Sequence, residues 1–390
     1  MNFRRPSLAA AACVASLLVL IAGCDKDKKG VVPPAELVDL KPTLAVQKLW
    51  DTGVGGGGEK LRLALGLALD GGVLYTAARG GEVIALDPAS GRAKWSQDTK
   101  ADLAAGPGVG ASLVAVGTSD GKVIALDLAS GKVLWKASVS SEVLSAPLVT
   151  GDRVIVRSVD GRVHALDALT GKSQWTGEEP VPKLSLRGTA PPVLAKDNVI
   201  AGFDSGKVIA FAVATGDIVW QAQVTTPGGR SELARLADVD SAVQVDGNDG
   251  FAAGFQGRVV MLALDSGQIW WSRDLSSYRA PALDDTQLYL ATADGSVVAL
   301  RRRDGAVVWQ QDGLKRRGLS APAVVGQAVL VGDFDGYLHW LDRDSGKFIA
   351  RERPGGERIS MAPVTDGDRA FVIDDGGRVV AFRSGGSAGR

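Results

Sequence analysis

Apolar and polar residues alternate in short runs, each bounded by glycine, from Trp50 to the C-terminus. Each unit holds a Gly, the run V-x-A-L-D, a Ser-Gly or Thr-Gly pair and then a tryptophan, as in GEVIALDPASGRAKW, which ends at Trp95. Strict alternation predicts β-strands, and the glycine pairs predict tight turns between them. The pattern returns about every 40 residues, a period typical of propeller blades. The later copies end at Trp135, Trp175, Trp220, Trp271, Trp309 and, with the tryptophan replaced, Ala350.

These units predict an all-β fold, because one four-stranded unit cannot bury both faces of its sheet and a closed ring of units can. Complete units end near the landmarks above, and a last partial unit, residues 359–383, lacks its final strand. Residues 46–50 form a strand with its tryptophan and nothing before it. We therefore predict an eight-bladed β-propeller of four-stranded antiparallel blades over residues 44–383, closed by this N-terminal strand in the last blade. Seven blades is the alternative count.

The start of the chain has the order of a bacterial lipoprotein signal. An arginine pair precedes an apolar stretch, residues 8–21, which is short for a membrane span. The sequence L-I-A-G-C then ends at Cys24, and small residues before a cysteine permit lipid transfer to its sulfur and cleavage ahead of it. We predict a signal peptide over residues 1–23 and a lipid anchor on Cys24. An ordinary secretory signal with an incidental cysteine is the alternative.

Polar and proline-containing residues follow this cysteine. Residues 24–43 show no sustained period, which predicts a lipidated N-terminus and a flexible tether. Residues 384–390, after the last repeat, are predicted to be a disordered tail. The predicted propeller is thus attached to a membrane through its N-terminus alone.

The composition offers little for catalysis. Lys and Arg together number 44 and so do Asp and Glu, so no charge excess indicates nucleic acid or an anionic membrane surface as a partner. The two cysteines, Cys13 and Cys24, precede the repeats, which leaves the body without a thiol. His164 and His339 take the same position in blades three and seven, on opposite sides of the predicted ring, and we interpret both as structural. We predict no enzyme activity, no metal site and no cofactor.

Two connections between blades are longer than the others, and irregular connections on a repeat scaffold are typical of binding sites. They run from Trp175 to Pro191 and from Trp220 to Asp238. Because they are the same connection in successive blades, we expect them side by side on one face. The predicted partner-binding residues are Leu184, Leu186, Arg187, Asp238 and Asp240, with Arg230, Glu232 and Arg235 as further candidates.

Apolar anchors beside an arginine and carboxylates are typical of the centre of a protein–protein interface. The alternative is that the leucines lie under their own loops and the charges are solvated. The Asp of each A-L-D run recurs with the repeat, which favours a role in the turn over a role in a single site.

The repeat resembles the PQQ-like propeller family, which includes quinoprotein alcohol dehydrogenases. Those enzymes use an adjacent Cys-Cys pair and a calcium ion held by carboxylate and amide ligands, and the repeats here show no counterpart. With its lipoprotein signal and three further stretches, the chain is similar to the BamB family, the lipoprotein subunits of the outer-membrane β-barrel assembly machinery. The stretches are L-S-L-R-G at 184–188, S-E-L-A-R-L-A-D-V-D at 231–240 and G-Y-L-H-W-L at 336–341.

That resemblance implies a propeller that is not an enzyme. Members of the family dock on the periplasmic POTRA domains of BamA and assist the assembly of unfolded outer-membrane β-barrel proteins. Their docking residues carry over to the five partner-binding residues named above. The resemblance also implies a lipid-anchored position on the periplasmic face of the outer membrane, although Asp25 next to the lipidated cysteine is an inner-membrane retention signal in enteric bacteria. The alternatives are a quinoprotein-like enzyme or sensor and an envelope propeller that binds polysaccharide.

Overall fold

The structure, a computed structural model, describes residues 32–55, 64–185, 190–226, 228, 231 and 236–387. The predicted signal peptide and Cys24 lie outside the described residues. Residues from Ala35 onwards form one compact unit, and the residues before it form another. The part of the chain that is described contains no helix long and apolar enough to cross a membrane.

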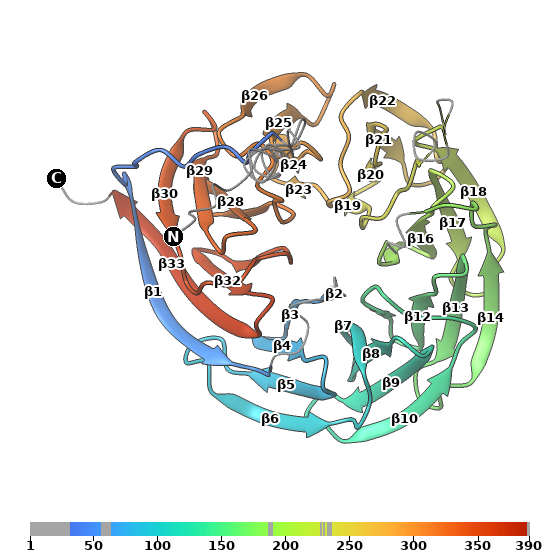
Figure 1. Ribbon diagram of the computed structural model, residues 1–390. Coiled ribbons are helices and arrows are strands. Elements are labelled where there is room, and N and C mark those ends of the chain that lie inside the picture. The colour runs from blue at the N-terminus through green and yellow to red at the C-terminus, as the bar shows by residue number, and fades with distance from the viewer. Residues whose placement is uncertain are drawn as a thin grey trace, which may run out of the picture. The chain divides into compact units, whose positions relative to one another are not determined.

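The unit that begins at Ala35 is a ring of antiparallel sheets (Figure 1). The middle strands of each sheet are buried on both faces, as in β9 (Lys122–Asp127), where Val123 to Leu126 are all inaccessible to solvent. The reason is that each sheet is covered by a neighbouring sheet on either side, so both sets of side chains lie in a core. The apolar clusters accordingly join adjacent blades; one holds Ile200 of blade 4 and Val260 of blade 5.

The first four sheets follow one another along the chain, and each runs in chain order from its innermost to its outermost strand. Blade 1 holds β3 (Leu67–Asp70), β4 (Val73–Ala77), β5 (Glu82–Leu86) and β6 (Ala93–Asp98). Blade 2 holds β7 (Leu103–Gly110), β8 (Leu113–Thr118), β9 and β10 (Val133–Ser138), with the short β2 (Ala64–Leu65) parallel to β7. Blade 3 holds β11 (Leu148–Val149), β12 (Arg153–Arg157), β13 (Arg162–Asp167) and β14 (Ser173–Glu178). Blade 4 holds β15 (Val193–Ala195), β16 (Asn198–Gly202), β17 (Lys207–Ala212) and β18 (Ile218–Gln223).

The next three sheets repeat this order, and the last one differs. Blade 5 holds β19 (Gln244–Asp246), β20 (Asp249–Ala253), β21 (Val259–Ala263) and β22 (Ile269–Arg273). Blade 6 holds β23 (Ala282–Leu283), β24 (Gln287–Ala291), β25 (Val297–Arg301) and β26 (Val307–Gln311). Blade 7 holds β27 (Ala323–Val325), β28 (Ala328–Gly332), β29 (Leu338–Asp342) and β30 (Phe348–Glu352). Blade 8 holds β31 (Val364–Asp366), β32 (Arg369–Ile373), β33 (Arg378–Ser387) and β1 (Leu44–Gly53).

The N-terminal strand closes the ring, as predicted. β1 pairs antiparallel with β33, and Trp50 lies opposite Ala381. The described residues therefore form eight blades, and the count of seven is wrong. The propeller also ends later than residue 383, because β33 continues to Ser387, which pairs with Leu44. The predicted disordered tail is thus corrected over residues 384–387, which belong to the closing strand pair.

Tryptophan side chains join neighbouring blades, as their place in the repeat predicts. In the described residues, the indole N–H of each repeat tryptophan donates to a backbone carbonyl in the turn between the third and fourth strands of the next blade. The pairs are Trp50–Pro88, Trp95–Leu128, Trp135–Ala168, Trp175–Val213, Trp220–Leu264, Trp271–Arg302 and Trp309–Arg343, at 2.7 to 3.1 Å. The turn glycine is required as well: Gly171 has φ +70°, and a Cβ there would lie 2.6 Å from the ring of Trp135.

The joint between blades 7 and 8 explains why Ala350 replaces the tryptophan. Blade 8 has no turn between its third and fourth strands, because β33 comes from the C-terminus and β1 from the N-terminus. A tryptophan at position 350 would find neither the carbonyl nor the glycine that receives it elsewhere. Trp340 of β29 fills this joint instead; it is fully buried and packs edge-on against Phe382, with ring centroids 5.6 Å apart.

The chain before β1 also contacts the ring. The Ala35 amide donates to the Lys315 carbonyl at 2.9 Å, and the Thr43 amide donates to the Ile349 carbonyl at 2.9 Å. Leu37 packs against an apolar cluster of blades 6 and 7. We call residues 35–43 the strap. The expectation of a flexible tether therefore does not extend to these residues, which are held by hydrogen bonds that the sequence pattern does not reveal.

Candidate functional site

The two long connectors follow β14 and β18. They span residues 179–192 and 224–243, whereas the connector after β10 spans 139–147 and the one after β22 spans 274–281. Each leads from the outermost strand of one blade to the innermost strand of the next. Because all blades have the same strand order, both connectors leave the ring at the same rim, at successive joints. The prediction of two lengthened connections on one face is confirmed.

The first connector is fastened at its start. The Glu179 amide donates to the Gly161 carbonyl at 3.0 Å, and the Glu179 carboxylate, in a side chain that is largely buried, pairs with the Lys207 ammonium at 3.0 Å. These contacts tie the connector to blade 3 and blade 4. Farther along, Leu184 exposes 45% of its surface. An apolar side chain held this far into solvent by a fastened loop is available to a partner.

The second connector is packed into the ring along its described part. The amides of Val224 and Thr225 donate to the Gly206 carbonyl at 2.9 and 3.0 Å, and the Val239 amide donates to the Phe203 carbonyl at 3.1 Å. The Asp238 carbonyl in turn accepts from the Phe255 amide of blade 5 at 2.8 Å. This segment therefore bridges the turns of blades 4 and 5, which places its acidic side chains at the joint.

Three carboxylates and one guanidinium gather at this joint; we call Arg157, Asp204, Asp238 and Asp240 the acidic cluster. Arg157 ends β12, is fully buried and donates to Asp204 at 2.5 Å, with its guanidinium 4.9 Å from the centroid of the Phe203 ring. Asp204 and Asp238 are 3% and 1% exposed, and Asp240 is half-buried. Among the described residues, one cation faces three carboxylates here, which gives this part of the joint an excess of negative charge in a place of low dielectric.

That excess changes the titration of Asp240. Burial is the largest cause, and together with the carboxylates of Asp238 and Asp204 it raises the pKa of the Asp240 carboxyl group to about 7, against the opposing effect of Arg157. One oxygen of Asp240, Oδ1, has no hydrogen-bond partner among the described residues. The side chain is therefore poised to take up a proton or to accept a hydrogen bond near neutral pH.

The structure brings some of the predicted residues together and leaves others out of view. Leu184 is exposed as predicted, whereas Asp238 is buried and Asp240 is only partly accessible. Asp238 thus lies inside the joint instead of on the surface of the connector. Five predicted residues lie outside the described residues: Leu186, Arg187, Arg230, Glu232 and Arg235.

Sequence reasoning missed Arg157 and Asp204, although the repeat contains a signal for the first. Arg157 occupies a register position at the end of the second strand that holds a small or apolar residue in the other blades. The equivalent residues are Ala77, Gly117, Gly202, Ala253, Ala291, Gly332 and Ile373. A charged residue at such a position indicates a local polar site, and aligning the repeats strand by strand would have found it.

The other polar centres of the described chain are separate and structural in character. His164 contacts the hydroxyls of Ser140 and Ser158, both at 3.1 Å, in blade 3. His339 contacts Asp333 at 3.0 Å in blade 7. No group of three or more His, Cys, Asp or Glu side chains in the described residues is arranged to hold a metal ion. The predicted turn role of the A-L-D aspartates is confirmed by Asp87, whose Oδ1 accepts from the amides of Ala89 and Ser90 at 2.9 and 3.0 Å.

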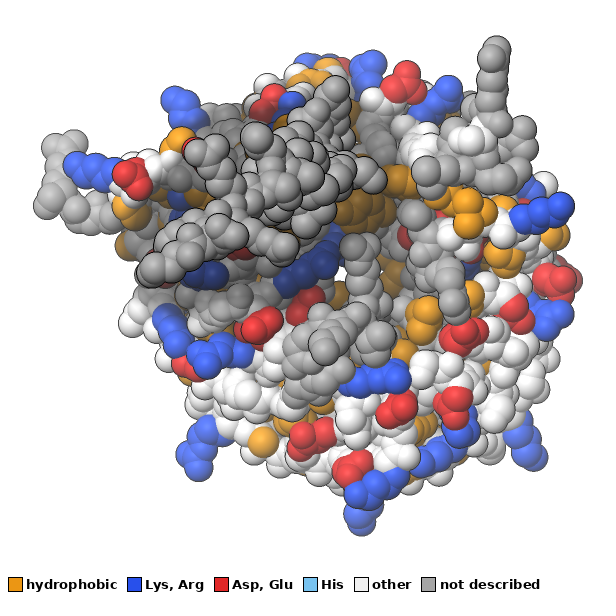
Figure 2. Space-filling model, viewed as in Figure 1, with side chains coloured by type: hydrophobic (Ala, Val, Ile, Leu, Met, Phe, Trp, Pro, Cys, Tyr) orange, Lys and Arg blue, Asp and Glu red, His pale blue; other side chains and the backbone are white. Residues whose placement is uncertain are grey.

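Figure 2 shows charges of both signs on the part of this face that the described residues form. Acidic and basic side chains alternate around the ring on this face, as the equal totals of the two types suggest. The fold is thus a β-propeller with two long connectors at successive joints of one rim.

Comparison with known proteins places this propeller in a family. The model of the family described as outer membrane protein assembly factor BamB matches residues 45–105, 79–311 and 294–388. An outer membrane protein assembly factor BamB from Pseudomonas aeruginosa is 46% identical over 371 residues, which is 95% of this chain and 98% of that protein. The crystal structure of BamB from Moraxella catarrhalis superposes with a TM-score of 0.79 at 27% identity and covers 87% of this chain and 100% of that one. The chain belongs to the BamB family.

Quinone-dependent enzymes share the fold alone. A europium-containing methanol dehydrogenase superposes with a TM-score of 0.70 at 16% identity, over 87% of this chain and 93% of that one. This likeness confirms the propeller fold. It carries no chemistry to this chain, because function lies in sites built on a fold and not in the fold itself.

Proposed function

We propose that this chain is a non-enzymatic scaffold subunit of the machinery that assembles β-barrel proteins in the outer membrane. Membership of the BamB family and 46% identity to an assembly factor of that name support the proposal. In it, Cys24 carries a lipid that holds the propeller on the periplasmic face of the outer membrane. The propeller docks on the POTRA domains of BamA, reaches the other subunits through BamA, and assists unfolded outer-membrane β-barrel clients.

The observation that carries this proposal is the pair of long connectors at successive joints of one rim, with Leu184 exposed on the first. Leu184 and Leu186 would enter an apolar groove of the partner, and Arg187 would fix the orientation through charged hydrogen bonds. Asp240, which is partly accessible, would accept a hydrogen bond from the partner. Asp238 would act from inside the joint, by holding the second connector in place.

Affinity capture of the lipoprotein from detergent-solubilised envelopes tests the docking. We expect the double variant Leu184→Ala/Arg187→Ala to recover at least tenfold less BamA than the unaltered protein, because both anchors are lost. Leu169→Ala is the matched control: Leu169 is 84% exposed and lies at the opposite end of β14, so its loss should leave recovery unchanged.

Thermal unfolding of both variants should match that of the unaltered protein, because Leu184 and Leu169 are exposed and contribute little to the core. Equal recovery of BamA by the double variant and the control would contradict the site assignment. Loss of BamA from the Leu169→Ala variant as well would move the docking surface away from the connectors.

A further inference from the structure

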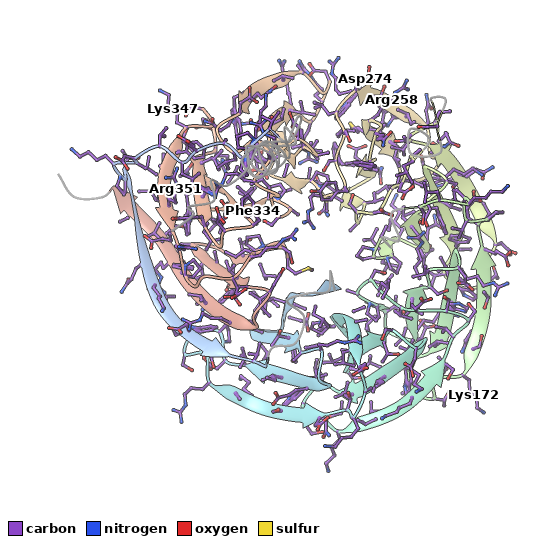
Figure 3. The ribbon with its side chains drawn as sticks, in the orientation of Figure 1. Lys172, Arg258, Asp274, Phe334, Lys347 and Arg351 are labelled. Carbon is purple, nitrogen blue, oxygen red and sulfur yellow. The ribbon has the colours of Figure 1, made fainter. Side chains whose placement is uncertain are left out.

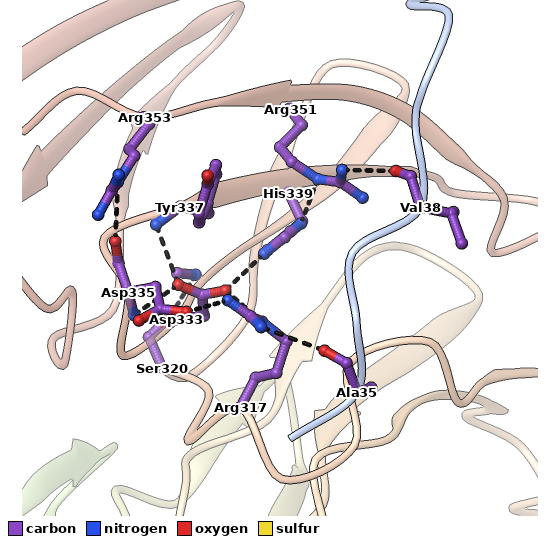
Figure 4. Close-up of polar contacts among 11 residues, drawn as sticks. Ala35, Val38, Arg317, Ser320, Asp333, Asp335, Tyr337, His339, Arg351 and Arg353 are labelled. Carbon is purple, nitrogen blue, oxygen red and sulfur yellow. Dashed lines mark hydrogen bonds and ion pairs between the residues drawn. The ribbon is translucent and has the colours of Figure 1, made fainter. Parts of the chain in front are cut away.

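The strap is held by a buried polar network in blade 7 (Figure 4). Arg317, which is 5% exposed, donates to Asp333 and to Asp335, each at 2.7 Å. Its remaining nitrogen, Nη1, donates to the Ala35 carbonyl at 3.2 Å. Two carboxylates thus fix the guanidinium on two sides, which leaves its third side directed at the strap.

A second arginine holds the strap farther along. Arg351 Nη1 donates to the Val38 carbonyl at 2.9 Å, and its Nε donates to His339 Nδ1 at 3.3 Å. Burial lowers the pKa of His339 and so favours the neutral ring. A neutral ring protonated on Nε2 donates to Asp333 and accepts from Arg351, so both contacts are satisfied at once.

Each of these hydrogen bonds uses a backbone atom of the strap, between Ala35 and Thr43. They therefore do not depend on which side chains the strap carries. Leu37 is held differently, through its side chain, which packs on an apolar cluster that contains Leu314 and Leu319. A segment with four backbone hydrogen bonds and one apolar anchor is part of the ring. The compact unit that holds the ring begins at Ala35, the first residue of the strap.

Ala35, where the strap begins, contacts the connector between blades 6 and 7, three joints around the ring from the connector that carries Leu184. That connector joins blade 3 to blade 4, and the strap lies on blade 7 and the connector before it. In a ring of eight blades, blade 7 is separated from blade 3 by three blades on either side. Figure 1 shows β14 and β30 on opposite sides of the ring.

We propose that the strap transfers the membrane attachment from the N-terminus to blade 7, so that blade 7 is held nearest the membrane and the connector that carries Leu184 is held away from it. The inference rests on the proposed function in one respect, the lipid on Cys24. Only residues 25–34 separate that residue from the strap, and ten residues span at most about 35 Å even when fully extended. Without the strap, the segment between Cys24 and the ring would run to Leu44, roughly twice as far.

The first test asks whether the strap is bound, and it needs no membrane. Hydrogen–deuterium exchange on the full protein in detergent should show the amides of Ala35 and Thr43 exchanging at least tenfold more slowly than in a Leu37→Asp variant. Val32→Asp, the same change at an exposed residue before the strap, is the control and should retain this protection. Rapid exchange at both amides in the unaltered protein would overturn the strap.

The second test measures the orientation with two equivalent turns. Lys172 and Lys347 are exposed, occupy the same position in blades 3 and 7 and project from opposite sides of the ring (Figure 3). Their carbonyls accept the same turn hydrogen bond, from Asp167 at 2.8 Å and from Asp342 at 2.7 Å. Each is changed to cysteine singly and labelled with a fluorescent donor, which is specific because no cysteine follows Cys24.

The labelled lipoproteins are reconstituted into phosphatidylethanolamine–phosphatidylglycerol vesicles that contain an acceptor lipid. We expect energy transfer from position 347 to be at least twice that from position 172. Insertion of about 20 Gly/Ser residues after Gly30 should remove the difference, because a long flexible chain no longer restricts the ring. Equal transfer from both positions in protein that floats with the vesicles would overturn the orientation. Protein that does not float would instead contradict the lipid anchor of the proposed function and the orientation with it, while the exchange measurement would still decide the strap.

Discussion

Arg157 and Asp240 show how two side chains make one joint of a regular ring unlike the others. The equivalent position to Arg157 is small or apolar in the other blades, so those joints pack through aliphatic contacts. At the joint of blades 3, 4 and 5, the buried guanidinium is matched to Asp204, and two more carboxylates lie beside the pair. Burying charge in this way costs folding free energy and is retained where it serves a site.

The unfavourable burial of the charged Asp240 carboxylate makes the free energy of unfolding depend on pH. Its pKa is raised to about 7 in the folded state, above the ordinary value of 3.8, so the folded protein binds a proton more tightly than the unfolded chain between these pH values. The contribution of Asp240 to the free energy of unfolding therefore falls as pH rises from about 4 to 7. We expect Asp240→Asn to stabilise the protein at pH 8 by on the order of 2 kcal/mol and to have little effect near pH 4.

Urea unfolding at several pH values measures this difference. Asp265→Asn, at an exposed carboxylate in a turn of blade 5, is the control. A stabilisation by Asp240→Asn that is the same at pH 4 and pH 8 would mean that the carboxyl group is not destabilised by its surroundings.

At the scale of the element, the turn between the third and fourth strands serves two blades. It links strands in its own blade, and its carbonyl and glycine receive the tryptophan of the preceding blade, as Ala168 and Gly171 receive Trp135. The repeat motif therefore specifies the contacts between two blades as well as the strands of one blade. The replacement at Ala350 follows from this, because blade 8 is the one blade in the described residues that lacks such a turn.

Two opposite substitutions, tryptophan to alanine and alanine to tryptophan, test this explanation of the joints. Trp135→Ala should destabilise the protein by about 3–5 kcal/mol, because a large buried side chain and its hydrogen bond are lost. Ala350→Trp, which restores the repeat consensus, should nonetheless destabilise it by about 1–3 kcal/mol, because Trp340 and Phe382 already fill the joint.

Denaturant unfolding with a fixed protein concentration gives both values. A neutral third variant, Leu134→Ala at an exposed residue next to Trp135, serves as the control. A gain in stability from Ala350→Trp would show that the eighth joint has room for the tryptophan, and that its absence needs another explanation.

At the scale of the whole molecule, the ring depends on the pairing of β1 with β33. This pairing joins the first and last strands of the unit, and it covers the edge that the last blade would otherwise present to solvent. The closing strand also contributes Leu44 and Val46 to the apolar cluster of blades 7 and 8.

Removal of β1 should open the ring. We expect a chain that starts at residue 54 to unfold at least roughly 10 °C below one that starts at residue 44, and to associate at high concentration through the exposed edge of β33. The chain that starts at residue 44 is the matched control, since both lack the strap. Thermal unfolding and size-exclusion chromatography measure the two effects. Equal melting temperatures and two monomers would mean that blade 8 is complete with three strands.

Much of this protein could be predicted from its residues in order. The repeat of V-x-A-L-D, Ser-Gly and Trp determines the strands, the turns and the number of blades, because each unit specifies contacts that recur at a fixed separation along the chain. The lone strand ending at Trp50 determines the closure for the same reason. The two long connectors are also visible as breaks in a regular spacing, and Leu184 is exposed as that spacing predicts.

Only the tertiary structure decided the chemistry of the joint and the course of the N-terminal segment. Asp238 is buried because blades 4 and 5 close over it, and Arg157 meets Asp204 across 47 residues. Residues 35–43 show no repeating pattern of apolar and polar residues. Their backbone is nevertheless held by Arg317 and Arg351, whose hydrogen bonds span 282 and 313 residues of the sequence. Such contacts depend on which blades the ring brings together. A pattern of apolar and polar positions predicts where the strands are, but it does not predict which residues lie next to them in space.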